Sequence, residues 1–160
     1  MLNVLGGGDI IGEMSLLTGA PRTATIRAAT TVTLGEINRD SFDHLLEEHP
    51  TVRERVWDAF AAHQFDNYTR NHSRYQHLAH DDRMGWIKAG TQSQHIAGRE
   101  FDVGSAEYMF VVLGEVDVEG LSADAPTLVS VAHHETLKAI GNCRVVLLPG
   151  LDEAIRHDMT

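Results

Sequence analysis

The chain has 160 residues, of which 42 % are hydrophobic and 22 % charged, a composition typical of a soluble globular protein with one or two domains. A formal net charge of −10 opposes sequence-independent binding to DNA or RNA, because such binding needs clustered Lys and Arg. The single cysteine, Cys143, cannot form an internal disulfide, and neither a signal-peptide pattern nor an apolar run near the ~20 residues that span a bilayer is present, so we expect a cytoplasmic location.

The first predicted elements are strands and turns. The run Gly6-Gly7-Gly8-Asp9 predicts a turn. Alternation of apolar and polar residues predicts two short strands, Ala24 to Ala28 and Val32 to Ile37.

Two helices are predicted next. Asp40 or Ser41 can cap the first helix, and Pro50 ends it and can occupy the first turn of the second. The second is predicted from Thr51 towards Tyr68, because apolar residues recur there at four-residue spacing. These residues are Val52, Val56 and Phe60.

The second half begins with a polar, His-rich connector, residues 70–80, and a short helix capped by Asp81 or Asp82 and running to Lys88. From Thr91 onwards strands predominate, and Leu151 to Ile155 predicts a short helical tail. The clearest strands are Tyr108 to Leu113, Val116 to Val118, Leu128 to Val131, Thr136 to Ala139 and Arg144 to Leu148.

A weak internal repeat relates the two halves. Thr25-Ile26-Arg27-Ala28 and Thr136-Leu137-Lys138-Ala139 lie 111 residues apart, and each precedes a similarly spaced apolar strand, a turn and a predicted helix. Two copies with loose identities leave open the alternative of two unrelated hairpins of common composition.

The segment Gly12 to Thr25 carries the most chemistry. Arg22 follows a Gly-Ala-Pro turn, and its planar guanidinium suits two-point binding of a phosphate. Glu13 accepts hydrogen bonds only, which suits a sugar hydroxyl, and Gly12 permits close approach of the backbone. These residues together predict a site for a sugar phosphate.

The same segment, Gly12-Glu13-Met14-Ser15-Leu16-Leu17 followed by Pro21-Arg22-Thr23-Ala24-Thr25, resembles the phosphate-binding cassette of the cyclic-nucleotide-binding domain family. The flanks are similar as well, since Ile37, Arg39 and Phe42 match the strand and helix that follow the cassette. The resemblance covers roughly residues 4–68. It implies that Arg22 binds the cyclic phosphate and Glu13 the ribose 2′-hydroxyl of cyclic AMP or cyclic GMP, with no other cofactor. The implied ligand-binding set is Gly12, Glu13, Met14, Ser15, Arg22, Thr23 and Ala24.

The resemblance also implies the fold class: mainly β with helices, a β-roll or jelly roll with a helical connector. We expect residues 1–72 to be the C-terminal part of one such domain, because few residues precede the cassette. We expect residues 73–160 to form a second, degenerate roll, since the stretch from Gly120 to Thr136 holds no cassette. The chain is thus expected to be part of a longer protein.

The leading functional hypothesis is a regulatory module, not an enzyme, that binds a cyclic nucleotide and relays binding by helix movement. Its expected partners are the nucleotide and a covalently linked transporter or effector, such as a bacterial cation/proton antiporter near the inner face of a membrane. The alternative is a ligandless scaffold for dimerisation or interdomain contact. A metal enzyme is a third hypothesis; the ten histidines suggest it, but no metal-ligand motif accompanies them, so no metal site is predicted.

Overall fold

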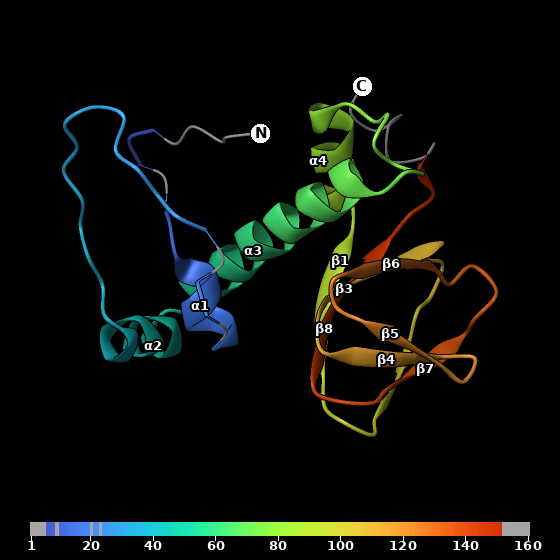
Figure 1. Ribbon diagram of the computed structural model, residues 1–160. Coiled ribbons are helices and arrows are strands. Elements are labelled where there is room, and N and C mark those ends of the chain that lie inside the picture. The colour runs from blue at the N-terminus through green and yellow to red at the C-terminus, as the bar shows by residue number, and fades with distance from the viewer. Residues whose placement is uncertain (1–5, 9, 20, 23, 152–160) are drawn as a thin grey trace. The chain divides into compact units, whose positions relative to one another are not determined.

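The computed structural model describes residues 6–8, 10–19, 21–22 and 24–151. The chain divides into two compact units, Met1–Phe60 and Ala61–Thr160, and the division falls inside a helix. Each unit is described by itself. The helices are α1 (Glu13–Thr18), α2 (Arg39–Glu48), α3 (Pro50–Asn71) and α4 (His80–Lys88) (Figure 1).

The predicted helices of the first unit are confirmed. Asn38, and not Asp40 or Ser41 as expected, caps α2 by accepting a hydrogen bond from the backbone N–H of Ser41 at 2.9 Å. Phe42 and Leu46 are the buried residues of α2. Pro50 opens α3, where the missing N–H of proline costs no helical hydrogen bond.

The two predicted strands of the first unit are wrong. Residues 24–28 and 32–37 have no strand structure, and all of them are exposed. Their alternating pattern suits a strand, but a strand also needs a hydrogen-bonded neighbour. Among the described residues of this unit no strand is available to pair with them.

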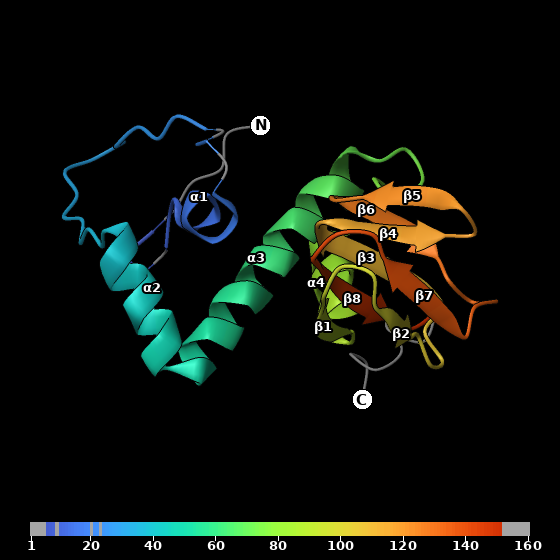
Figure 2. The ribbon, with the colours of Figure 1, turned by 90° about the horizontal axis from the view of Figure 1, so that it is seen from below.

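The second unit contains eight strands in two antiparallel four-stranded sheets, in the orders β1-β8-β3-β6 and β2-β7-β4-β5. This is the arrangement of a jelly roll, so the predicted fold class is confirmed for this half (Figure 2). The strands are β1 (Thr91–His95), β2 (Glu100–Asp102), β3 (Tyr108–Leu113), β4 (Glu115–Val118), β5 (Leu121–Asp124), β6 (Thr127–Ser130), β7 (Thr136–Ala139) and β8 (Cys143–Leu148).

Strand β3 shows why this sheet forms. Met109 and Val111 point into the core between the sheets, whereas Phe110 contacts the ring of Phe65 from α3 on the other face. A strand that is buried on both faces is apolar throughout, which explains the unbroken run Tyr108–Leu113. Gly114, with φ of 82°, follows at a register shift where a side chain would collide with the backbone of Asn142.

Helices α3 and α4 cover the outer face of the sheet that contains β3. Ala61, Phe65 and Thr69 form a stripe at four-residue spacing along α3 and are all buried. Trp86 of α4 is fully buried; its ring packs edge-on against Phe65 and Tyr108, and its Nε1 donates to the carbonyl of Pro149 at 2.9 Å. Helix α4 begins at His80, so Asp81 and Asp82 lie in its first turn and do not cap it.

The predicted tail helix, Leu151 to Ile155, lies outside the described residues except for Leu151, which is helical. No described helix is both long enough and apolar enough to cross a membrane.

Candidate functional site

The predicted cassette folds around the short helix α1. Gly12 precedes the helix with a φ of 83°, and Gly19 follows it with a φ of 71°, so both occupy the left-handed region that favours glycine. The hydroxyl of Ser15 donates to the carbonyl of Gly12 at 3.1 Å, and the hydroxyl of Thr18 donates to that of Met14 at 2.7 Å. The turn is thus held by its own side chains.

Arg22 is brought to the start of α1. Its Nη1 donates to the carbonyl of Gly12 at 3.1 Å, and a Cβ built on Gly12 would lie 1.9 Å from the same nitrogen. Glu13 is the next residue along the chain and is half-buried. The guanidinium of Arg22 therefore lies beside the backbone next to Glu13. This is the segment in which the sequence predicts that both residues bind the ligand.

The remaining predicted ligand residues are less informative. Met14 and Ser15 are half-buried on α1, and Ala24 is exposed in the irregular segment that follows. Thr23 lies outside the described residues. The roles of all seven residues therefore stay predictions.

Arg39 is a residue whose contact sequence reasoning missed. Its Nη1 donates to the carbonyl of Leu16 at 3.1 Å, and its Nη2 donates to that of Ser15 at 3.0 Å. These carbonyls lie in the last turn of α1, where arginine commonly donates to backbone acceptors, and that of Ser15 also accepts from the N–H of Gly19 at 3.2 Å. The sequence matched Arg39 to the family pattern but gave no partner, because the two positions lie more than 20 residues apart.

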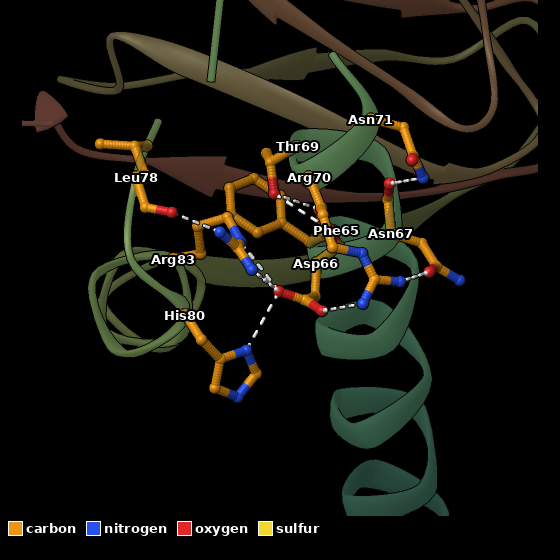
Figure 3. Close-up of polar contacts among 9 residues, drawn as sticks. All are labelled: Phe65, Asp66, Asn67, Thr69, Arg70, Asn71, Leu78, His80 and Arg83. Atoms are coloured by element: carbon orange, nitrogen blue, oxygen red, sulfur yellow. Dashed lines mark hydrogen bonds and ion pairs between the residues drawn. The ribbon is translucent and has the colours of Figure 1, made fainter. Parts of the chain in front are cut away.

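A second polar cluster lies in the other unit, centred on Asp66 of α3 (Figure 3). Arg83 of α4 donates to Asp66 Oδ1 from Nε at 2.8 Å and from Nη2 at 2.7 Å, and His80 Nδ1 lies 3.1 Å from the same oxygen. Arg83 also donates from Nη1 to the carbonyl of Leu78. Arg70 Nη1 is 3.9 Å from the other carboxylate oxygen.

These contacts determine the ionisation of Asp66. Burial by itself would raise the pKa of Asp66, but hydrogen bonds from Arg83 and His80, together with the positive charges of these groups, outweigh it and lower the pKa below its ordinary value of 3.8. The carboxylate is thus held ionised between α3 and α4. This favours a structural role over proton transfer at neutral pH.

Two histidines of the second unit have described side-chain contacts with other residues. His95 stacks on Phe101 with ring centroids 3.8 Å apart, and burial lowers its pKa below the ordinary value of 6.5. His134 Nε2 is 3.4 Å from a carboxylate oxygen of Glu119. Within the described residues, no group of three or more His, Cys, Asp or Glu side chains could hold a metal ion.

Comparison with known proteins finds one family model and several more distant relatives. Residues 1–49 match the family model described as "Cyclic nucleotide-binding domain". The human potassium/sodium hyperpolarization-activated cyclic nucleotide-gated channel 2 is 35 % identical over 82 residues, which cover 51 % of this chain and 9 % of the channel. The corresponding rat channel 4 is 26 % identical over 153 residues, covering 84 % of this chain and 13 % of the channel.

Solved structures give a looser likeness. The regulatory domain of Toxoplasma gondii PKA, crystallised with cAMP, has a TM-score of 0.40 and 21 % sequence identity and covers 97 % of this chain and 64 % of that one. The chain spans only 9 % and 13 % of the two channels. The family match over residues 1–49 includes the cassette, so this part of the chain is similar to cyclic nucleotide-binding domains.

Proposed function

We propose that the cassette, residues 12–24, binds a cyclic nucleotide and that the chain is a regulatory module of a larger protein. The observation that carries this proposal is the hydrogen bond from Arg22 to the carbonyl of Gly12, which holds a guanidinium next to the half-buried Glu13. A guanidinium can bind a cyclic phosphate at two points, while a carboxylate accepts a hydrogen bond from a ribose hydroxyl.

The linked effector is proposed to be a membrane transport protein. The two relatives named above are potassium/sodium channels described as cyclic nucleotide-gated, which supports a link to ion transport. A bacterial cation/proton antiporter is one transport protein that would fit this proposal. Helix movement as the relay also remains a proposal, since it requires different affinities for the nucleotide in two positions of the helices.

The test is titration calorimetry of the full-length protein with cyclic AMP and cyclic GMP. We expect Arg22→Ala to weaken binding about 10-fold to 100-fold, because a hydrogen bond to a charged group contributes about 1.5–3 kcal/mol. Arg27→Ala is the matched control, since Arg27 is exposed in the same segment. Equal affinity of Arg22→Ala and wild type would remove the assignment.

A second experiment tests whether the position of Arg22 matters. Gly12→Ala should weaken nucleotide binding, though by less than Arg22→Ala, because the new methyl group displaces the guanidinium from its present position but does not remove it. Gly19→Ala is the control: it carries similar backbone strain at a φ of 71°, but no atom lies within 4 Å of its Cβ. If Gly12→Ala and Gly19→Ala weaken nucleotide binding equally, backbone strain explains the loss, and the position of Arg22 does not.

We propose that the second unit is a scaffold that binds no ligand. The alternative hypothesis of the sequence analysis assigned this role to the whole chain. Only residues 131–135 join β6 to β7, and they contain no helix comparable to α1. The space between the two sheets is filled by apolar side chains, among them Met109, Val111 and Val145. If the full-length protein binds neither cyclic AMP nor cyclic GMP, the scaffold role would apply to both units.

A further inference from the structure

Each sheet of the second unit ends in two edge strands, which have a strand neighbour on one side only among the described residues. They are β1 and β6 in one sheet and β2 and β5 in the other. The open side of an edge strand can bind a further strand through backbone hydrogen bonds, so proteins commonly protect their edges with charged side chains or proline. The four edges of this unit differ in that protection.

Three of the four edges are protected in this way. Strand β2 is only three residues long and carries Glu100 and Asp102, and β5 carries Asp124. Strand β6 directly follows Pro126, which has no N–H. Strand β1 has the sequence Thr-Gln-Ser-Gln-His, and His95 is its only ionisable side chain. Burial lowers the pKa of His95 below its ordinary value of 6.5, so the edge of β1 is uncharged at neutral pH.

Side-chain hydrogen bonds hold β1 in place on the sheet. Arg144 of β8, which is 7 % exposed, donates from Nη1 to Gln92 Oε1 at 2.9 Å and from Nη2 to Gln94 Oε1 at 3.0 Å. Strand β1 also pairs with β8 over its whole length. The edge is thus held extended before any partner binds, which lowers the entropic cost of adding a strand.

The sequence of β1 fits a second copy of itself. Gln92-Ser93-Gln94 reads the same in both directions. In an antiparallel pair centred on Ser93, that residue faces Ser93 of the second copy, and Gln92 faces Gln94 of the second copy. A two-fold symmetric interface requires this kind of self-complementarity. In the same register Ile96, which is 68 % exposed, faces Gly90 of the second copy, where no side chain opposes its burial.

Charge also favours β1 over the other edges as the contact between copies. The chain has a formal net charge of −10, so two copies repel each other. Pairing through β2 or β5 would bring carboxylates of the two copies close together, which destabilises a strand pair. Pairing through β1 places only uncharged side chains opposite one another.

We propose that two copies of the chain associate through β1, in antiparallel register with Ser93 at the two-fold axis, so that the sheet β1-β8-β3-β6 continues into that of the second copy. This interface gives the scaffold role proposed for the second unit a partner. It does not depend on nucleotide binding, so its failure would leave the assignment of the cassette unchanged.

Sedimentation equilibrium of the full chain over a range of concentrations tests the proposal. The mass of wild type should rise with concentration from that of one chain towards that of two. Ser93→Lys and Ser93→Glu should each weaken dimerisation at least about 10-fold, because the axis places two like charges directly opposite each other. An equimolar mixture of these two variants should restore the dimer, because lysine then faces glutamate.

Ser130→Lys is the matched control, since it places the same charge on β6, at the opposite edge of the same sheet. This control should dimerise like wild type, and circular dichroism should show that all three variants are folded. A wild type that stays monomeric, a dimer that Ser93→Lys leaves intact, or equal weakening by Ser130→Lys would overturn the proposal.

Hydrogen exchange on the unsubstituted chain keeps the proposal testable if the Ser93 variants fail to fold. Amides of residues 91–95 that point away from β8 should exchange at least about 10-fold more slowly at a concentration where the dimer predominates than at one where the monomer does. Amides of residues 127–130 should exchange at the same rate at both concentrations. Unchanged exchange in β1 would contradict pairing through this edge.

Discussion

Replacing Trp86 by alanine should lower the free energy of unfolding of the second unit by about 4 kcal/mol. The indole is 0 % exposed and lies between α3 and β3, where it contacts the rings of Phe65, Tyr75 and Tyr108. Its removal leaves a cavity that these rings can fill only in part. Urea unfolding followed by circular dichroism measures the loss.

Trp86→Phe separates the contribution of packing from that of the hydrogen bond. Phenylalanine keeps an aromatic ring but cannot donate to the carbonyl of Pro149, so we expect a smaller loss, about 1–2 kcal/mol. A loss below 1 kcal/mol for Trp86→Ala would show that the helices do not depend on this side chain for their packing on the sheet.

Replacing Arg83 by alanine should destabilise the second unit by about 3 kcal/mol. The side chain is only 7 % exposed, and its removal leaves the Asp66 carboxylate and the carbonyl of Leu78 without their closest donor. Arg70→Ala is the matched control, because Arg70 is 3.9 Å from the same carboxylate but 43 % exposed. We expect that control to lose less than about 1 kcal/mol. Equal losses in the two variants would contradict the central role of Arg83.

The same cluster predicts a dependence on pH. The pKa of Asp66 is lower in the folded chain than its ordinary value of 3.8, so the ionised carboxylate stabilises the fold above about pH 3.8. This contribution is lost as the pH falls through the folded-state pKa. Asp66→Asn should therefore show a shallower loss of stability than wild type below pH 4 in urea unfolding. Parallel curves for the two proteins would contradict this assignment.

Sequence periodicity predicted the elements whose own residues carry a clear apolar pattern. Strands β3 and β7 begin and end where expected, and α3 (Pro50–Asn71) begins one residue before and ends three residues after the predicted helix. Strand β5 was missed, because Leu121–Asp124 is short and largely polar. Residues 24–28 show the opposite error, since a strand pattern cannot reveal whether a neighbouring strand is present.

In the candidate site, too, some contacts could be predicted from the sequence and others could not. Arg22 and Gly12 lie ten residues apart, on either side of α1, and the cassette places both in one short segment of the sequence. Asp66 and Arg83 are 17 residues apart, on two helices whose connection has no periodic pattern, so their pairing could not be predicted. The same holds for Arg39 and the carbonyls of α1.

The two hydrogen bonds of Arg39 have a mechanical consequence. They join the last turn of α1 to the first residue of α2, so the cassette and the following helix are tied at a single side chain. If α1 shifts, either α2 follows at its first turn or both bonds break. Lysine has one ammonium group in place of the fork and could not hold the two carbonyls in the same way, so this coupling depends on the shape of arginine as well as on its charge.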